Sequence, residues 1–505
     1  MIPEGLQPLR RRHRWGGLRW SLVGLLLLAW ALRLPPLLRS PLHPDEALYG
    51  YWGLLIGRGQ DPWLTSGPVY KPPLWPYLVS AFQLLFGDTR IALRLPGVMA
   101  GLLAVPLTGA LARVLYDDAW TGASATTAAA LSPFAITFSG TAFPDPLMVT
   151  WGLGACVAAA RGRSRWAGLL AGLSFATKQT GLVWLPLALG LMLARGAGRG
   201  PCAQDAGLRG FLIACLAPIG LVFAWDGVRV ALGGDAFWSA GVVGYGGLRL
   251  IWAHELWSRL RTWAGPMGAL FASPGVHVLL LAGLPVLLLR ALIQRPGPGH
   301  ALFDLLLVSF PIAYVLLHWL VAFPIWSRYL LPLAPVLAVL LGRVIRVIAS
   351  LESGHQQCSY RPALGALLLV LLLVLPARRA SAGRSSLAEE GAPYDGIDAV
   401  ISFFSELPEG SVVYHHWLGW HYHYGLFDAP VYLAYWPTPA WLARDVQAFG
   451  WRDPRYVTFP AWESSARTER ALGDVGYALE PAFQVRGDRG DRAFVVYRVV
   501  QSSAP

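Results

Sequence analysis

Residues 20–38 read WSLVGLLLLAWALRLPPLL, an apolar run long enough to cross a bilayer as one helix. The run is too long for the core of a cleaved signal, and no small-residue cleavage site follows it. Similar runs recur along the first three quarters of the chain, which is 55% hydrophobic and only 14% charged. This composition lies outside the range of soluble globular proteins. We therefore predict a polytopic α-helical membrane protein with about 11 transmembrane helices.

Basic residues predict how these helices are oriented. Arg10, Arg11 and Arg12 precede the first run and place the N-terminus in the cytoplasm, and other arginines lie in short loops. We read the net charge of +12 as this orientation signal, so we expect no nucleic-acid partner. The expected spans are residues 20–38, 91–115, 119–138, 147–160, 211–225, 276–293, 301–320, 329–341 and 364–375, with two short helices in 166–193 that break at 177–181.

The remaining segments divide the chain into two predicted domains. Leu74–Phe86 is short for a span, so we expect it to lie along the outer membrane surface, although the residue count leaves a crossing open. After residue 376 the pattern changes to strand-like alternation with mixed charge. We therefore predict a transmembrane module over residues 1–376 and a small external α/β domain over 377–505, in a cell membrane with the C-terminal domain extracytoplasmic.

Only two lysines occur among the 41 basic residues, Lys71 and Lys178. Lys71 opens Lys71-Pro72-Pro73, and Lys178 lies inside an apolar run. An ammonium group is costly near a membrane, and in such places it usually binds an anion or lines a substrate path. Both positions point to a phosphate ligand.

Acidic motifs accompany the two lysines. His43-Pro44-Asp45-Glu46 follows the first span, and Asp145 stands between Pro144 and Pro146. Asp45 and Glu46 would also suit the start of a helix, with Asp45 as its cap. Asp145 would equally suit a turn.

These motifs form an ordered series that resembles the glycosyltransferase C superfamily, in its protein mannosyltransferase and aminoarabinose transferase-like branch. The resemblance covers residues 17–376. The series consists of the acidic pair at 45–46, Lys-Pro-Pro-Leu at 71–74, Arg-Leu-Pro-Gly at 94–97, Asp-Pro at 145–146, Thr-Lys-Gln-Thr-Gly at 177–181 and Arg-Tyr-Leu-Leu-Pro at 328–332.

The resemblance implies a membrane enzyme that transfers a sugar from a polyprenyl-phosphate donor to an acceptor hydroxyl on the outer face of the membrane. The acceptor would be a protein, a lipid or a glycan. A positioned carboxylate should take the proton of the attacking hydroxyl, and fixed cations should stabilise the leaving phosphate. Direct displacement with one such base would invert the anomeric centre.

Site residues are assigned by matching this series to the chemistry. The expected catalytic group is Asp45 as base, with Glu46 beside it and Asp145 holding acceptor or sugar hydroxyls. The expected lipid-phosphate contacts are Lys71, Lys178 and Arg328, with Arg94 weaker. Weaker acceptor or sugar contacts are expected at His43, Tyr70, His254 and Glu255.

One departure concerns metal binding. Aminoarabinose transferases have Glu before the Lys-Pro, where this chain has Tyr70, and that Glu can share a metal with a distant His. His254-Glu255 would replace only part of such a site, so we predict no metal and no cofactor. A histidine-rich stretch at 415–423 invites a metal, but we favour a polar aromatic surface there.

A transporter or flippase of a lipid-linked sugar is the alternative reading of the whole chain. It would use the same cations and broken helices without chemistry. The sequence shows no inverted repeat, and its acidic motifs are expected outside the membrane instead of at its centre.

Overall fold

The computed structural model describes residues 7–196, 200–244, 249–293, 300–351, 361–384, 392–487 and 492–502. The chain forms two compact units. The first comprises residues 1–39 and 59–387, and the second comprises residues 40–58 and 388–505. Residues 40–58, which the sequence analysis placed in the membrane module, thus group with the C-terminal part of the chain.

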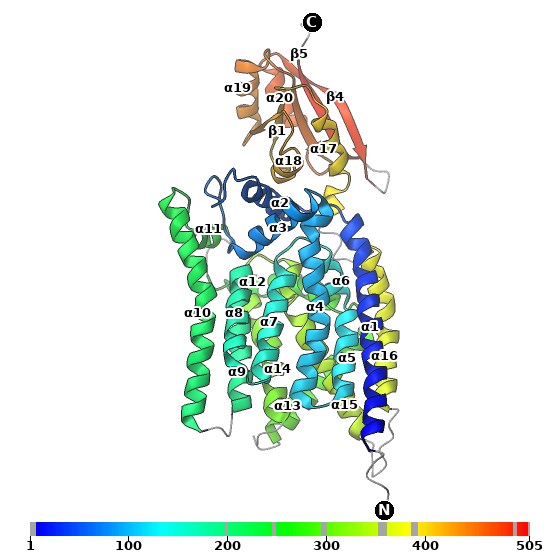
Figure 1. The fold of residues 1–505 in the computed structure, drawn as a ribbon. Helices are drawn as coiled ribbons and strands as arrows, with labels where there is room; N and C mark the ends of the chain where they lie inside the picture. The colour runs from blue at the N-terminus through cyan, green and yellow to red at the C-terminus, as the bar shows by residue number, and fades with distance from the viewer. Residues whose placement is uncertain are drawn as a thin grey trace, which may run out of the picture. The chain divides into compact units, whose positions relative to one another are not determined.

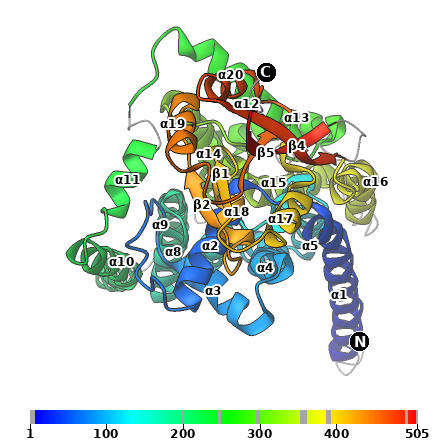
Figure 2. The same ribbon diagram turned by 90° about the horizontal axis from the view of Figure 1, so that it is seen from above.

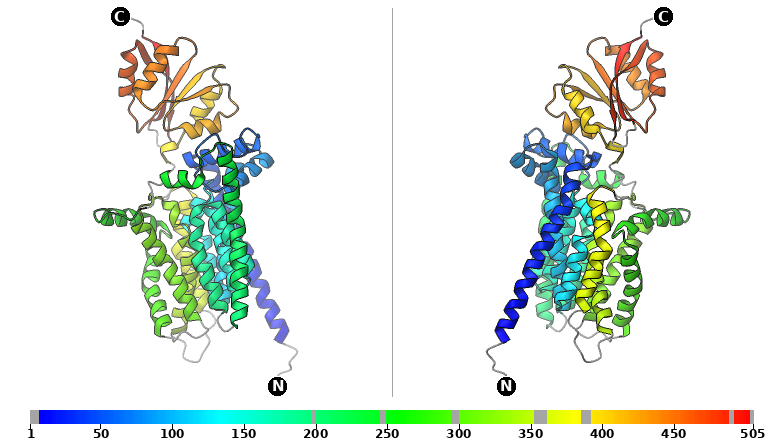
Figure 3. Two further views of the ribbon diagram at one scale, coloured as in Figure 1. Left: turned by 90° about the vertical axis from the view of Figure 1, so that its left-hand side faces the viewer. Right: turned by 90° about the vertical axis from the view of Figure 1, so that its right-hand side faces the viewer.

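The first unit is a bundle of helices that run side by side (Figures 1 and 3). Its helices are α1 (Gln7–Arg39), α3 (Leu74–Phe86), α4 (Arg90–Tyr116), α5 (Ala119–Ala130), α6 (Pro133–Ser139), α7 (Asp145–Ala160), α8 (Ser164–Thr177), η2 (Gln179–Val183), α9 (Trp184–Gly196), α10 (Pro201–Ala231), α11 (Phe237–Gly244), α12 (Glu255–Ala269), α13 (Pro274–Ile293), α14 (His300–Leu320), η3 (Ser327–Leu330), α15 (Leu333–Leu351) and α16 (Arg361–Ser381).

Among the described residues, 7 helices are long and apolar enough to cross a membrane, namely α1, α4, α10, α13, α14, α15 and α16. The helices α3 and α7 are apolar but shorter. The polytopic helical fold is therefore confirmed, whereas the predicted number of spans stays a prediction.

The predicted break at residues 177–181 is present, because η2 separates α8 from α9. The expected single span 119–138 instead forms two helices, α5 and α6. Ser132 caps α6 by accepting the Ala135 N–H at 3.3 Å, and Pro133 occupies the first turn. Proline is favoured there because its missing N–H is not needed at a helix start.

Small residues let helices approach closely in this unit. Figure 2 views the bundle from above, with α8 and α10 side by side. A Cβ at Gly172 of α8 would lie 2.5 Å from the Cys215 carbonyl oxygen of α10. Glycine is therefore required where the two backbones meet, as is common in membrane helix packing.

The second unit combines one helix from the first loop with an α/β fold. Its elements are α2 (Pro44–Gly57), η5 (Ala392–Tyr394), α17 (Ile397–Ser405), β1 (Val412–His415), α18 (Gly419–Gly425), β2 (Tyr432–Tyr435), α19 (Pro439–Phe449), β3 (Arg455–Pro460), α20 (Ala466–Gly473), β4 (Tyr477–Arg486) and β5 (Arg492–Gln501).

The sheet has the order β2-β1-β3-β5-β4. β1 runs parallel to β2 and β3, while β5 is antiparallel to β3 and β4. Val413 and Tyr414, neighbours in β1, are buried in two separate hydrophobic clusters, as the alternation of side chains in a strand requires. The predicted C-terminal α/β fold is confirmed.

Candidate active site

Lys178 interrupts the helices at the end of α8. Its backbone is extended, with φ −158° and ψ 138°, and the chain then turns into η2. Gly181 makes this turn possible, because a Cβ there would collide with the backbone of Ser174 in α8. The glycine of Thr-Lys-Gln-Thr-Gly therefore has a steric role.

Asp145 receives the Lys178 side chain. Lys178 Nζ lies 2.5 Å from Asp145 Oδ1, and the two side chains are 2% and 1% exposed. Asp145 Oδ2 has no hydrogen-bond partner among the described residues. Asp145 begins α7, where the positive end of the helix dipole favours a carboxylate. The turn reading of Asp145 is therefore incomplete, since its side chain forms a buried ion pair.

The Arg-Tyr-Leu-Leu-Pro motif packs on the same pair. Lys178 Nζ lies 4.4 Å from the centre of the Tyr329 ring. Arg328 places its guanidinium 4.4 Å from the centre of the Phe143 ring, two residues before Asp145. The Tyr314 hydroxyl of α14 donates a hydrogen bond to the Tyr329 carbonyl and fixes η3. Cations over aromatic faces are stabilised by the ring quadrupole.

The Lys-Pro-Pro loop joins this group through its backbone. Gln179 Nε2 donates to the Tyr70 carbonyl oxygen at 2.5 Å, which brings the residue before Lys71 against the residue after Lys178. Lys71 is 5% exposed, and its Nζ lies 5.2 Å from the centre of the Tyr70 ring. Lys178 thus contacts the Asp145 carboxylate directly, while Phe143 and Gln179 join Arg328 and the segment that carries Lys71 to this buried pair.

Arg94 makes a hydrogen bond to helix α1. It is fully buried near the start of α4, and its Nη1 donates to the Leu37 carbonyl oxygen of α1 at 3.3 Å. A Cβ at Gly97 would lie 3.3 Å from the Ser139 carbonyl oxygen and closer still to that of Thr141. The Arg-Leu-Pro-Gly motif therefore joins α4 to α1 and to the segment after α6, and a phosphate role for Arg94 stays a prediction.

Sequence reasoning missed the residues that order the loop before Lys71. Arg229 of α10 is fully buried and donates to the carbonyl oxygens of Leu64, at 2.9 Å, and of Trp63, at 3.0 Å. Its Nη1 also lies 3.1 Å from Asp226 Oδ1. Arg229 therefore holds the loop that leads to Lys71. An arginine three residues after an aspartate at a helix end was a signal that the sequence offered.

The acidic pair begins α2 in the second unit. His43 is the N-cap, and its Nδ1 accepts the Asp45 N–H at 3.1 Å. Glu46 completes a capping box, because its Oε2 accepts the His43 N–H at 3.0 Å. The expectation that Asp45 caps this helix is wrong, since His43 and Glu46 do so. Glu46 thus helps to fix the start of the helix whose first turn carries Asp45.

Helix α18 of the same unit packs on α2. His421 Nε2 lies 2.8 Å from the Leu42 carbonyl oxygen, directly before His43. Because a carbonyl only accepts, Nε2 carries the hydrogen. Burial lowers the pKa of His421 to about 4, so the imidazole is neutral. At Gly50 of α2 a Cβ would lie 2.6 Å from the Tyr424 ring. His421 and Tyr424 of the histidine-rich stretch thus contact the segment that carries Asp45 and hold it in place.

His254 and Glu255 lie at the start of α12 in the first unit. Arg249 binds the Glu255 carboxylate in two places, at 2.7 Å each, and Trp252 N–H donates to it at 2.7 Å. These bonds, with that from Arg249 the largest cause, lower the pKa of Glu255 to about 2. Glu255 therefore orders the loop before α12. Within the described ranges, no three His, Cys, Asp or Glu side chains are grouped to hold a metal ion, and the absence of a cofactor stays a prediction.

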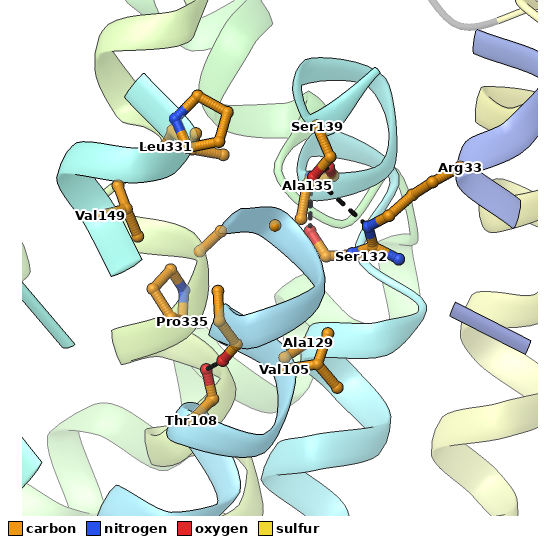
Figure 4. A pocket seen from close by; sticks show the side chains of 14 residues that line it. Arg33, Val105, Thr108, Ala129, Ser132, Ala135, Ser139, Val149, Leu331 and Pro335 are labelled. Atoms are coloured by element: carbon orange, nitrogen blue, oxygen red, sulfur yellow. Dashed lines mark hydrogen bonds between the residues drawn. The ribbon is translucent and has the colours of Figure 1, made fainter. Parts of the chain in front are cut away.

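A small cavity of about 30 Å³ lies inside the first unit (Figure 4). Its lining is mostly apolar and includes Pro146, next to Asp145, and Leu331 after η3. Arg33 supplies the charged group, with Nε bonded to Ser139 Oγ at 3.3 Å and Nη1 to the Ala29 carbonyl oxygen at 2.9 Å. The cavity thus offers a hydrocarbon-like surface beside the buried cations.

Comparisons with known proteins bear on this geometry. Residues 70–225 match the family model described as dolichyl-phosphate-mannose-protein mannosyltransferase. This range includes Lys71, Asp145 and Lys178. No curated protein matches the chain by sequence.

Solved structures share the fold. ArnT from Cupriavidus metallidurans bound to undecaprenyl phosphate is 17% identical with a TM-score of 0.60, over 95% of this chain and 98% of ArnT. The apo form is 16% identical with a TM-score of 0.63, over 96% and 98%. The archaeal oligosaccharyltransferase AglB from Archaeoglobus fulgidus, in complex with an inhibitory peptide and a dolichol-phosphate, is 14% identical with a TM-score of 0.52, over 97% and 75%.

These relatives are glycosyltransferases, and two of the structures hold a polyprenyl-phosphate lipid. The family match over residues 70–225, together with the shared fold over almost the whole chain, confirms the resemblance to the polyprenyl-phosphate-dependent glycosyltransferases of the C superfamily.

Proposed function

We propose that the chain is an integral membrane glycosyltransferase that moves a sugar from a polyprenyl-phosphate donor to an acceptor hydroxyl on the outer face of the membrane. The observation that carries the proposal is the buried pair of Lys178 and Asp145, which Phe143 and Gln179 join to Arg328 and to the segment before Lys71. Four separate sequence motifs contribute to this group. Buried ammonium and guanidinium groups suit the phosphate of a lipid carrier better than a neutral substrate.

The reaction follows from these charges. The acceptor oxygen attacks the anomeric carbon and forms the new glycosidic bond, while the bond from that carbon to the phosphate oxygen breaks. The bonding electrons leave with the lipid phosphate, whose extra negative charge the two lysines and Arg328 stabilise. Attack on the face opposite the leaving group inverts the anomeric centre.

Asp45 is proposed as the base that receives the acceptor proton. Support comes from the capping arrangement of α2, in which His43 and Glu46 satisfy the helix start. The first turn of α2 thereby holds the Asp45 carboxylate in a defined position, which suits proton transfer. Asp145 is proposed to orient Lys178 and to receive sugar or acceptor hydroxyls at Oδ2, which has no partner among the described residues.

The test follows the release of free polyprenyl phosphate in membranes that contain the full chain. Undecaprenyl-phosphate hexoses and pentoses form the donor panel, and wild type is compared with Asp45→Asn. A matched control is Asp428→Asn, which changes an exposed carboxylate of the same unit. We expect donor-dependent release that Asp45→Asn abolishes and Asp428→Asn retains.

Folding is checked by the thermal unfolding midpoint of each purified variant. Release that persists in a folded Asp45→Asn variant would remove Asp45 as the base. Movement of an intact lipid-linked sugar across the bilayer without release would replace the enzyme by a flippase.

A further inference from the structure

The second unit has a topological switch point that the transfer reaction does not use. From β1 the chain passes to β2 on one side, and β3 lies on the other side of β1. All three strands are parallel, so their carboxyl ends lie at one edge of the sheet. In open α/β sheets, ligands bind outside the carboxyl ends at the place where the strand order reverses. Here that place lies between β1 and β3.

Four side chains stand there, which we call the aromatic cluster: His416 and Trp417 after β1, and Trp462 and Glu463 after β3. Trp417 is 58% exposed and Trp462 is 48% exposed. Both are large hydrophobic side chains in contact with water, although β3 just before Trp462 is buried throughout. Two exposed indole rings at the same edge of the sheet indicate a ligand-binding surface.

Each member of the aromatic cluster is held in place. His416 Nδ1 lies 3.0 Å from the Trp436 carbonyl oxygen, and the His416 and Trp417 rings meet edge to face at 4.8 Å. The Tyr394 ring meets Trp462 at 5.6 Å, also edge to face. The Glu463 backbone N–H donates to the Pro460 carbonyl oxygen at 2.9 Å, and its carboxylate is hydrogen-bonded by Trp417. The cluster is therefore preorganised.

His416 and Glu463 are the polar members of the aromatic cluster, and both can form hydrogen bonds with sugar hydroxyls. Because the Trp436 carbonyl only accepts, His416 Nδ1 carries the hydrogen of this bond, and Nε2 accepts a hydrogen bond whenever the ring is uncharged. Burial raises the pKa of Glu463, and the charge of His416 and a hydrogen bond from Trp417 oppose this rise. The Glu463 side chain is thus partly buried beside His416 and Trp417.

We propose that the aromatic cluster binds a pyranose unit of a glycan. The apolar face of the ring would stack on Trp417 or Trp462, and its hydroxyls would donate to Glu463 and His416. Aromatic faces bury large apolar area in defined geometry, and carboxylate and imidazole groups pair with hydroxyls. The site goes beyond the proposed transfer activity, because binding here needs neither the lipid donor nor Asp45.

A membrane-interface anchor is the competing explanation, since tryptophan is enriched at lipid headgroups. An anchor has no use for a carboxylate withdrawn from water between aromatic groups, so the half-buried Glu463 favours the sugar. The two explanations differ in whether a sugar contacts Trp417 and Trp462.

The experiment uses the full chain in nanodiscs, because sugar-based detergents would compete for the site. Saturation-transfer difference NMR is recorded with methyl α- and β-pyranosides of glucose, galactose, mannose and N-acetylglucosamine and with a neutral trisaccharide of each. The variants are Trp417→Ala, Trp462→Ala and Glu463→Gln. Trp451→Ala is the matched control, since Trp451 is 66% exposed and lies before β3, at the opposite end of that strand.

We expect transfer to the ring C–H protons of at least one glycoside, with affinity reduced at least tenfold in Trp417→Ala or Trp462→Ala and unchanged in Trp451→Ala. Glu463→Gln should weaken binding and shift its sugar preference. No transfer to any sugar of the panel would overturn the proposal. Equal binding by wild type and all three cluster variants would also overturn it. Asp45→Asn separates this site from transfer, because it should leave sugar binding intact.

Discussion

Mutations can separate the contribution of the buried Lys178–Asp145 pair to stability from its contribution to sugar transfer. With Nζ and Oδ1 2.5 Å apart and both side chains at most 2% exposed, removal of one partner leaves a charge uncompensated in the protein interior. Such a change costs roughly 3–5 kcal/mol of the free energy of unfolding. We therefore expect Lys178→Met or Asp145→Leu alone to lower the unfolding midpoint strongly.

The double variant Asp145→Leu/Lys178→Met should behave differently. Replacement of a buried pair by apolar side chains of similar volume is often neutral or stabilising by about 1–4 kcal/mol. Its unfolding midpoint should therefore return close to that of wild type. Its transfer rate should still fall about 10²–10³-fold, as expected for the loss of one preorganised charge at a reacting group.

A matched control is the pair Arg343–Asp304, which joins α15 to α14 at 3.2 Å and is also buried. The double variant Asp304→Leu/Arg343→Met should retain transfer. The assay is donor-dependent release of polyprenyl phosphate, measured beside the thermal unfolding midpoint in the same membranes. Recovery of both stability and transfer in Asp145→Leu/Lys178→Met would refute the reasoning, because the pair would then have a structural role alone.

Three further changes test the supporting structure. Gly181→Ala should destabilise the first unit and abolish transfer, because its Cβ meets the Ser174 backbone, whereas Gly220→Ala, with open space around the Cβ, should leave the unfolding midpoint unchanged. The pKa of His421 is about 4 in the folded chain against an ordinary 6.5, so the unfolded chain binds the proton more tightly. The free energy of unfolding is therefore highest above pH 6.5, and it falls by roughly 3 kcal/mol as the pH is lowered to 4. Chemical unfolding at several pH values should show this slope in wild type and a smaller one in His421→Phe. Arg229→Lys should loosen the loop before Lys71, since one ammonium cannot make the guanidinium contacts, and limited proteolysis should then cut residues 59–70 faster.

Periodicity and apolar length were sufficient to predict the helical fold and the break at Lys178. They were not sufficient at residues 119–138, where Ser132 and Pro133 end one helix and begin another within a continuous apolar run. Mean hydropathy over a long window does not detect Ser132 and Pro133, because the surrounding residues are apolar. Proline is favoured at the first turn of a helix, so it marks a new start without making the run polar. The boundary is decided by a local cap instead of by composition.

The candidate site was predicted in its residues but not in its contacts. The ordered motifs pointed to Asp145, Lys178 and Arg328, yet nothing in the spacing shows that Gln179 bonds the Tyr70 carbonyl and so joins Lys71 to them. Glu255 shows the reverse case, because the sequence made it a candidate and the structure gives it an ion pair with Arg249. Pairing across many residues depends on the packed fold, which a motif list does not contain.

The choice of lysine over arginine at residue 178 follows from the space around it. A compact ammonium reaches Asp145 Oδ1 and the face of Tyr329 from a single point, and the side chain is almost fully buried. A guanidinium is planar and carries five donors, so at this position it would leave several of them buried without acceptors. At residue 328 the planar group is the better choice, because it stacks against Phe143. In a chain whose positive charges are arginines except at Lys71 and Lys178, the lysine at 178 is thus explained by the geometry of one carboxylate and one aromatic ring, and the same point charge suits a phosphate oxygen.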